Sequence, residues 1–327
     1  MSGSLRLIFF GNSQSVFSNQ LFIPLLKAAC ELVGVVDVPP AKRQSTNPQT
    51  GNAVPCFVEA ARVRGTPVFE PANPNTPDFE ADLTSLDPDL FLAAGYMFLL
   101  KPPLLSIPHK IAVNFHASLL PAYRGKHPVF WALRNGEREA GLTAHVMDPC
   151  FDTGDILYQV RVPTLKQDTV KSLYERILAS SVPLVPRLIA DTAHGRLQRI
   201  PQPESGASYY SSPAEDDFHL DWTFPAESLR RWIHISPGEC WSKVAGRRVF
   251  FMDAELVRYK GGAAAGELVR LGGGRATVAA GGNALVLQRV LPEGEADRPL
   301  SQLCSELDLQ VGDRLEWEQA NAPRNIS

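Results

Sequence analysis

The chain has 327 residues, a mass of 35.8 kDa and a net charge of −3 at pH 7. Since domains usually hold roughly 100 to 200 residues, this length predicts two of them. Hydrophobic residues make up 44% and charged residues 20%, a balance that excludes a wholly disordered chain. With 32 basic residues against 35 acidic ones, no overall positive field draws the chain to nucleic acid or anionic lipid.

Location and metal content are predicted from what the sequence lacks. The first apolar run stops at Gly11, and no stretch approaches the roughly 20 apolar residues that span a membrane. The five cysteines include no C-x-x-C pair, which indicates free thiols in a reducing compartment. We therefore expect a cytoplasmic protein with no membrane partner. We also expect no metal, because none of the seven histidines falls in a ligand-spaced cluster.

Strand-like and helical patterns alternate through the first part of the chain. Apolar runs predict strands at residues 5–10, 32–38, 67–69, 90–94 and 111–116. Helical periodicity predicts helices at residues 15–30 and 54–64, and the polar stretch 41–52 is typical of a loop. Strands that alternate with helices predict an α/β fold with a doubly wound, Rossmann-like, mostly parallel sheet.

The pattern changes further along the chain. A short helix is predicted at 128–133, then two strands at 142–147 and 156–162 that form a hairpin or a sharply bent pair. A longer amphipathic helix is predicted at 170–192.

Residues 200–219 are rich in Pro, Ser, Gly and acidic residues, a composition typical of a linker. Beyond it we expect a helix at 225–233 and short strands, set between glycine-rich turns, at residues 248–252, 254–259, 277–279 and 284–290. The domains are therefore predicted at 1–199 and 220–327, with the second one smaller, mostly β and OB-like.

The first candidate site lies in the strand 111–116. Alternation along a strand places Asn114 and His116 on one face. Ligands bind beyond the carboxyl ends of parallel strands, where an amide and an imidazole can stabilise an oxyanion. A polar strand end with a hydrogen-bonded core histidine is the alternative. The first turn, GNSQSV, lacks the G-x-G-x-x-G spacing and disfavours a dinucleotide.

Asp152 is the second candidate. It lies in the sequence FDTGD, where Gly154 permits a tight turn that can return a carboxylate to the strand ends. A carboxylate near an imidazole orients it and raises its pKa, which gives a coupled acid-base pair. The alternative is that Asp152 or Asp155 only caps its own turn.

The run N-x-H-A-S-L-L-P-A-Y-R-G-x-x-P, followed by G-L-T and F-D-T-G-D-I, resembles the 10-formyltetrahydrofolate-dependent formyltransferase family. Similarity extends over nearly the whole chain, through VVDVPP, LDW and the closing VGDRL. In length and domain order, the members most similar to it are methionyl-tRNA formyltransferase and the sugar N-formyltransferases with the same second domain.

The resemblance implies an enzyme, a co-substrate and a site. Asn114, His116 and Asp152 correspond to the family's catalytic triad, and its folate-binding turn corresponds to Ser118, Leu119, Leu120 and Pro121. A neutral primary amine would attack the formyl carbon of 10-formyltetrahydrofolate. Asn114 and a protonated His116 would stabilise the oxyanion, and Asp152 would hold charge opposite His116.

The resemblance implies methionyl-tRNA as the default acceptor, and the alternative is a small molecule such as a nucleotide-linked amino sugar. Methionyl-tRNA formyltransferases usually carry W-R-G-A-A-P-I and a basic loop, whereas this chain has Y-R-G-K-H-P-V, and its loop holds only Lys42 and Arg43. From residue 208 onward the chain has 13 basic and 17 acidic residues. This net negative charge does not favour the binding of a polyanion.

Two further alternatives are less favoured. A formyltetrahydrofolate hydrolase would share the triad but begin with a regulatory domain, whereas the first predicted strand here starts at residue 5. A non-catalytic folate- or RNA-binding module would not need Asn114, His116 and Asp152 together.

Overall fold

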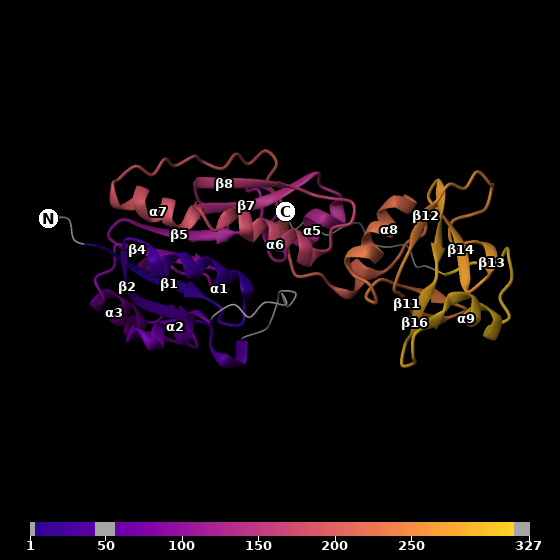
Figure 1. The fold of residues 1–327 in the computed structure, drawn as a ribbon, viewed down its shortest axis with the longest axis horizontal. Coiled ribbons are helices and arrows are strands. Elements are labelled where there is room, and N and C mark those ends of the chain that lie inside the picture. The colour runs from indigo at the N-terminus through magenta and orange to yellow at the C-terminus, as the bar shows by residue number, and fades with distance from the viewer. Residues whose placement is uncertain (1–3, 43–55, 317–327) are drawn as a thin grey trace.

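The computed structural model describes residues 4–42 and 56–316. Its elements form two groups that lie end to end in Figure 1. We call the first group, from β1 to α7, the α/β domain and the second, from α8 to α9, the β domain. Residues 194–225 connect the two domains.

Strands of the α/β domain span Leu5–Gly11 (β1), Cys30–Asp37 (β2), Val68–Phe69 (β3), Leu90–Ala94 (β4), Ile111–His116 (β5), Arg124–Gly125 (β6), Glu139–Val146 (β7) and Ile156–Pro163 (β8). Its helices span Val16–Phe22 (α1), Phe57–Val63 (α2), Pro77–Ser85 (α3), Pro102–Leu105 (α4), Pro128–Asn135 (α5), Val170–Ser181 (α6) and Leu184–Ala193 (α7). Short 3-10 helices occupy Ile23–Lys27 and Pro40–Lys42.

One seven-stranded sheet organises the α/β domain. Its order is β3-β2-β1-β4-β5-β7-β8, with parallel pairing from β3 to β5 and antiparallel pairing from β5 to β8. The predicted mostly parallel, doubly wound sheet is confirmed, and so is the hairpin, which β7 and β8 form. The strand order switches from one side of β1 to the other between β1 and β4, and ligands of open α/β folds bind at such a switch point.

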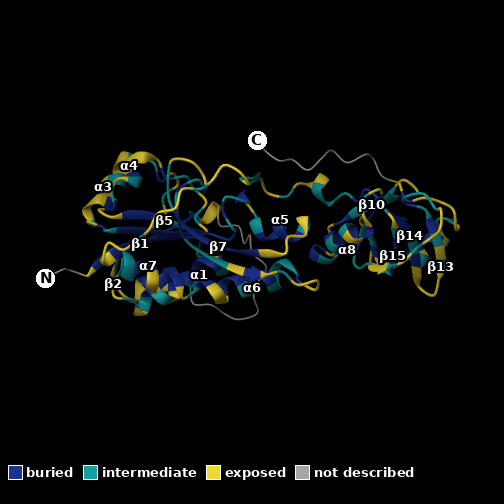
Figure 2. Cartoon of the chain, turned by 90° about the horizontal axis from the view of Figure 1, so that it is seen from above, coloured by how far each residue is buried: buried dark blue, intermediate teal, exposed yellow. Residues whose placement is uncertain are grey.

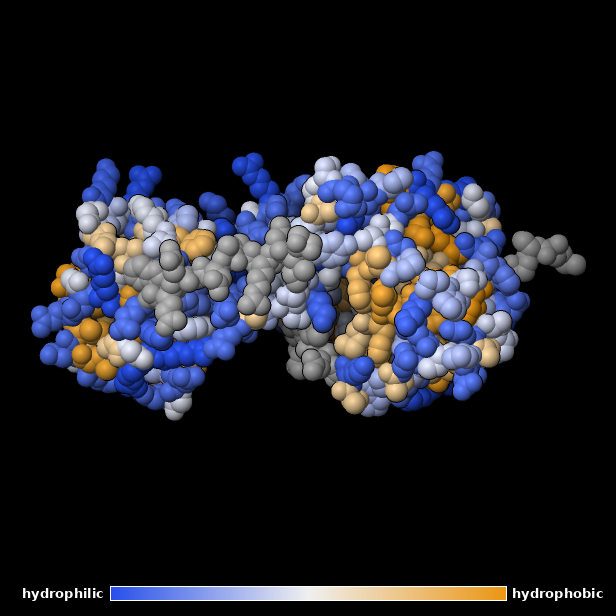
Figure 3. Space-filling model, turned by 180° about the vertical axis from the view of Figure 1, so that it is seen from behind, coloured by the Kyte–Doolittle hydropathy of each residue, from blue (hydrophilic) through white to orange (hydrophobic). Residues whose placement is uncertain are grey.

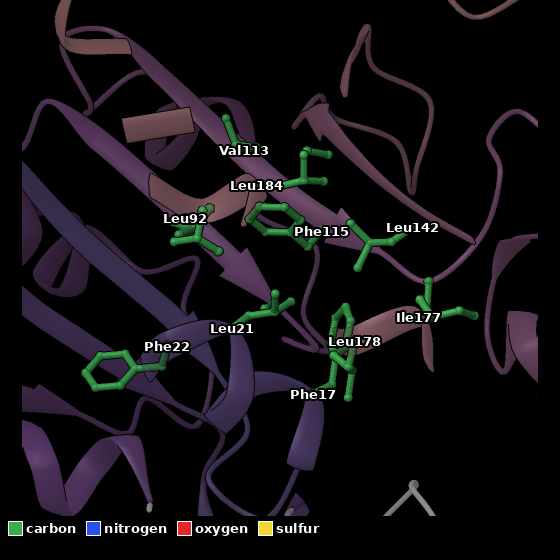
Figure 4. Packing of buried hydrophobic residues seen from close by; sticks show 14 of the residues in the cluster. Phe17, Leu21, Phe22, Leu92, Val113, Phe115, Leu142, Ile177, Leu178 and Leu184 are labelled. Carbon is green, nitrogen blue, oxygen red and sulfur yellow. The ribbon is translucent and has the colours of Figure 1, made fainter. Parts of the chain in front are cut away.

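Helices cover both faces of this sheet because its strands are apolar on both sides. Along β1, Leu7 and Phe9 belong to one core, while Ile8 and Phe10 belong to the other. This is the two-residue alternation of a strand. In the first core, helices α1, α6 and α7 pack side chains against residues of β4, β5 and β7, as Figure 4 shows for Leu21, Leu178 and Leu184.

The β domain contains two four-stranded antiparallel sheets, ordered β10-β11-β16-β17 and β12-β15-β14-β13. Its strands span Trp241–Val244 (β10), Arg247–Phe251 (β11), Glu255–Val257 (β12), Leu268–Gly272 (β13), Arg275–Ala280 (β14), Asn283–Leu287 (β15), Arg289–Pro292 (β16) and Arg298–Pro299 (β17). Helices Ala226–Ile235 (α8) and Leu300–Glu306 (α9) complete it. Both sheets contribute to one apolar core, which confirms the mostly β prediction.

Helices α5 and α8 form a contact between the two domains (Figure 1). The indole N–H of Trp232 donates to the carbonyl oxygen of Arg134 at 3.0 Å, and the Arg134 guanidinium lies 3.9 Å from the centre of the same ring. Arg231 donates to that carbonyl as well, at 3.2 Å. A cation stacked on an indole adds attraction to the apolar contact.

Two predicted helices are wrong in extent, for the same reason. The helix predicted at 15–30 ends as α1 at Phe22 and continues as a 3-10 turn with Pro24 near its start. The helix predicted at 170–192 divides at Pro183 into α6 and α7. Proline lacks the backbone N–H and clashes with the preceding turn, so it ends a helix that periodicity alone would continue.

The β domain also differs from expectation in detail. The strand predicted at 284–290 is two strands, β15 and β16, separated by Gln288, whose N–H donates to Asp253 rather than to a strand. Helix α9 and strands β10 and β13 were not predicted. Part of the loop predicted at 41–52, and the start of the helix predicted at 54–64, lie outside the described residues.

Candidate active site

The candidate site lies at the carboxyl end of β5. Asn114 and His116 leave this strand on the same face, and antiparallel pairing places His145 of β7 directly opposite Asn114. His116 is 7% exposed and His145 is 2% exposed, while Asn114 is half-buried. The two strands are dark blue in Figure 2 for most of their length, so these polar side chains emerge from an otherwise apolar layer.

A tight turn after β7 carries Asp152 back to this strand end. Asp152 has a backbone φ of 58°, in the left-handed region that is uncommon for residues other than glycine. At Gly154 a side chain is impossible, because a Cβ there would lie 2.0 Å from the carbonyl oxygen of Val146. The requirement for glycine and the left-handed backbone of Asp152 define the path of this turn, which brings Asp152 to the strand end.

The carboxylate of Asp152 is the centre of the cluster. Its Oδ1 lies 3.3 Å from Asn114 Nδ2, 3.3 Å from His145 Nε2 and 3.5 Å from His116 Nδ1. Its Oδ2 accepts the backbone N–H of Gly125 at 3.0 Å. The structure thus brings together the three residues predicted as catalytic. Their roles in catalysis stay a prediction.

Opposing effects act on the pKa of Asp152. Burial favours the neutral carboxyl and would raise this pKa, but the charge of His116, the hydrogen bond and charge of His145, and the Gly125 N–H together outweigh burial. The net result is a pKa well below the usual range of a carboxyl group. Asp152 is therefore ionised at neutral pH and is poised to hold a cationic imidazole.

His116 faces acceptors on both sides of its ring. Its Nε2 lies 2.8 Å from the carbonyl oxygen of Tyr123, which can only accept a hydrogen bond, so Nε2 carries a proton. Its Nδ1 faces the Asp152 carboxylate. A second proton on Nδ1 completes this arrangement, and the geometry therefore suits an imidazolium.

His145 is a member of the cluster that the sequence did not reveal. Among the seven histidines, only His116 was named as a candidate from the sequence. The Nε2 of His145 lies 3.1 Å from Asn114 Nδ2 and its Nδ1 lies 2.9 Å from the carbonyl oxygen of Val146. A signal was present in principle, because His145 lies in the strand predicted at 142–147, but only the β5–β7 pairing shows that it faces Asn114.

The predicted folate turn follows β5 directly. Ser118 and Leu120 are buried, and Thr143 and Gln159 hold the backbone of the turn: Thr143 bonds the backbone of both Ser118 and Leu120, and Gln159 donates to the Leu120 carbonyl. Leu119 and Pro121 are half-buried, so their surfaces remain available to a ligand.

A cavity of about 100 Å³ lies behind this turn, between it and the start of α5. Ser118, Leu119 and Tyr123 line it, but Asn114, His116 and Asp152 do not. It is therefore separate from the carboxylate cluster. The binding of folate by residues 118–121 stays a prediction.

Within residues 4–42 and 56–316 no group of three or more metal-ligating side chains comes together. Over the same residues, no helix has the length and apolar character needed to cross a bilayer. The cytoplasmic location stays a prediction.

Comparison with known proteins decides the family. The formyl transferase family matches residues 5–189, and the formyl transferase C-terminal domain matches residues 214–306. The chain belongs to the formyl transferase family. The predicted family and the predicted formyl-transferring enzyme are confirmed.

Named relatives extend over nearly the whole chain. The methionyl-tRNA formyltransferase of Synechococcus sp. (strain JA-3-3Ab) is 30% identical over 323 residues, which are 95% of this chain and 98% of the relative. That of Pseudomonas putida (strain KT2440) is 34% identical over 298 residues, 89% of this chain and 93% of the relative.

Solved structures share the fold. The sugar 3N-formyl transferase WlaRD, solved with dTDP and 5-N-formyl-THF, covers 90% of this chain and all of its own, with a TM-score of 0.62 and 15% identity. The N-formyltransferase from Helicobacter canadensis, in complex with folinic acid and dTDP-3-aminofucose, covers 88% of this chain and 99% of its own, with a TM-score of 0.63 and 16% identity. Both agree with the expected two-domain fold.

Proposed function

We propose that this formyl transferase moves the formyl group of 10-formyltetrahydrofolate to the primary amine of a small molecule, with Asn114, His116 and Asp152 as its catalytic residues. The observation that carries the proposal is the Asp152 carboxylate, which is buried, ionised and in contact with Asn114, His116 and His145. Folate ligands in the named solved relatives support the donor.

The cluster suits attack by an amine on a formyl carbon. The nitrogen forms a bond to this carbon, and charge then develops on the formyl oxygen. Asn114 Nδ2 can donate to that oxygen, since it is half-buried and its contact with Asp152 is long, at 3.3 Å. A cationic His116 would supply positive charge beside it, with the Asp152 carboxylate 3.5 Å from its Nδ1.

Protons must also balance. As the bond to N10 of the cofactor breaks, N10 takes up a proton, and the attacking amine loses one. A carboxylate or an ordered water accepts the proton of the amine. In this mechanism the formyl group is never covalently attached to the protein, so no side chain of the cluster has to act as a nucleophile.

Charge on the β domain favours a small acceptor over a transfer RNA. A polyanion is held mainly by cationic side chains that contact its phosphates. Four arginines of this domain already contact carboxylates, namely Arg247, Arg248, Arg289 and Arg298. On the face that Figure 3 shows, both hydrophilic and apolar areas occur on this domain, which lies on the left in that view.

Methionyl-tRNA is a second candidate acceptor, since the relatives that match most of the chain are methionyl-tRNA formyltransferases. The experiment is formyl transfer from 10-formyltetrahydrofolate to charged methionyl initiator tRNA and to a panel of nucleotide-linked amino sugars and free amines, with tetrahydrofolate release as the readout. We expect turnover with a small amine. Rapid turnover with the tRNA that falls steeply with salt would overturn the small-molecule proposal.

A further inference from the structure

The connection between the domains also pairs with a strand next to the candidate site. Residues Tyr209–Tyr210 (β9) pair in parallel with β6, residues Arg124–Gly125. The backbone N–H of Arg124 donates to the Ser208 carbonyl at 2.8 Å, and that of Lys126 donates to the Tyr210 carbonyl at 2.8 Å. At Gly125 a Cβ would lie 2.4 Å from the Tyr210 oxygen, so only glycine permits this approach.

The strand held in this way is the one that holds the catalytic side chains. Within residues 123–125, the Tyr123 carbonyl accepts from His116, and the Gly125 N–H donates to Asp152. A shift of the connection would therefore move a partner of each residue. The two contacts come from the backbone, so no substitution of residues 123–125 removes them cleanly.

Gln202 makes a second and more direct link. Its side-chain Nε2 donates to the carbonyl of Asp152 at 2.9 Å and to that of Gly154 at 2.7 Å. Its Oε1 accepts from Arg124 Nη2 at 2.9 Å and Nε at 3.2 Å. All four hydrogen-bond contacts of this amide join the Asp152 turn to the strand that carries Gly125.

The burial of Gln202 sets it apart from its neighbours. Residues 198–206 are all described, and Gln202 is half-buried while every other residue in this range is exposed. Arg124, its partner, is 2% exposed, and the carboxylate nearest to that guanidinium is the exposed Glu204, at 3.5 Å. The amide oxygen of Gln202 is thus the closest acceptor for a buried cation.

We propose that Gln202 is a positioning residue of the formyl transfer site: it holds the Asp152 turn against the strand 124–125 and so fixes the Asp152 carboxylate between His116 and Asn114. The proposal rests on the catalytic role proposed above for Asp152. It assigns to the connection between the domains a part in catalysis, in addition to joining them.

Two substitutions separate the two halves of the amide. Gln202→Ala removes both the donor and the acceptor. Gln202→Glu keeps acceptor oxygens for Arg124 but places them against the carbonyl oxygens of Asp152 and Gly154. Glu204→Gln is the matched control, because Glu204 lies two residues away and is the exposed neighbour of the same guanidinium.

We expect Gln202→Ala to lower kcat by about 10- to 100-fold, because small displacements of catalytic groups carry costs of this order. KM for 10-formyltetrahydrofolate should change less than about 3-fold, because Gln202 lies outside the predicted folate turn. Gln202→Glu should be no more active than Gln202→Ala, and Glu204→Gln should match the wild type. Full activity of Gln202→Ala, or rescue by Gln202→Glu, would overturn the proposal.

A readout without turnover separates this proposal from the proposed function. The pKa of Asp152, followed by carboxyl ¹³C NMR and assigned with Asp152→Asn, should be higher in Gln202→Ala than in Glu204→Gln. Equal values in the two variants would refute the positioning role. If the wild type formylates no acceptor, the proposed function fails, and the NMR comparison still decides the role of Gln202. If Gln202→Ala does not fold, Gln202→Glu takes its place in both measurements.

Discussion

The two domains treat charged side chains in opposite ways. At the end of β5 the α/β domain buries a carboxylate and two imidazoles within a cluster. The core of the β domain is built from apolar side chains, and its ion pairs, such as Arg298–Glu306, lie at the surface. Buried charges stabilise a fold only when they are fully paired. Substitutions that change charge should therefore affect activity when they lie in the cluster of the α/β domain and have little effect when they lie on the surface of the β domain.

Asp152→Asn is the strongest test of this contrast. The substitution keeps the shape of the side chain but removes the charge opposite His116, so we expect kcat to fall by about 10²- to 10⁴-fold with folate binding nearly intact. Steady-state kinetics and tetrahydrofolate binding measure the two effects. Asp155→Asn, in the same turn, is the control and should have a far smaller effect. Equal losses of binding and turnover in Asp152→Asn would indicate a structural role.

Phe251→Ala tests the opposite domain. Phe251 is fully buried and packs edge-on against Trp222, with ring centres 5.6 Å apart. Its truncation should lower the free energy of unfolding of the β domain by about 3–5 kcal/mol. Phe250→Ala, one residue away on the outer face of β11, should cost less. Denaturant unfolding gives both values. We expect kcat per folded molecule to stay the same. A large change in kcat would show that the core of the β domain also affects activity.

The stability of the α/β domain should depend on pH through Asp152. Because the pKa of Asp152 is depressed in the folded state, its stabilising contribution is complete above the unfolded value of about 4 and is lost as pH falls toward the folded value. The difference in unfolding free energy between wild type and Asp152→Asn should change by about 1.4 kcal/mol per pH unit below pH 4, to the disadvantage of the wild type. Urea unfolding between pH 6 and pH 2.5 measures it, and a constant difference would mean that Asp152 titrates normally.

His145→Gln should have an intermediate effect. Glutamine keeps a polar group near Asn114 but changes the position of the atom that faces Asp152, so we expect a fall in kcat of about 10-fold or less. His109→Gln, at an exposed histidine paired with Asp87, is the control and should leave kcat unchanged. Wild-type kinetics for His145→Gln would show that His145 does not contribute to catalysis.

Arg298→Ala should have the smallest effect. This arginine contacts Glu295 and Glu306 at the surface of the β domain. Exposed ion pairs contribute about 0.2–1 kcal/mol each, so unfolding should be nearly unchanged and kcat should match the wild type. Thermal unfolding in low and high salt measures the pair. A loss of turnover would show that the β domain's surface charges serve the acceptor after all.

The sequence allowed the sheet, the family and the three proposed catalytic residues to be predicted, because each has a local signal. Alternation placed Asn114 and His116 on one face of a strand, and the turn around Gly154 marked Asp152. Gln202 has no such signal, and the predicted strand 142–147 did not show which residue His145 would face. Their relevance depends on strand pairing and on the path of the connection between the domains, which bring together residues 31 to 50 positions apart. Helix ends were missed where proline competed with periodicity, as at Pro183.

The contact between α5 and α8 has a consequence for spectroscopy. Trp232 belongs to the core of the β domain and also reaches this contact, where its indole N–H donates to the Arg134 carbonyl and the Arg134 guanidinium stacks on its ring. If the domains part without unfolding, Trp232 loses both contacts with Arg134. A change in its emission would then report the separation of the domains, so the native chain carries its own optical probe of this movement.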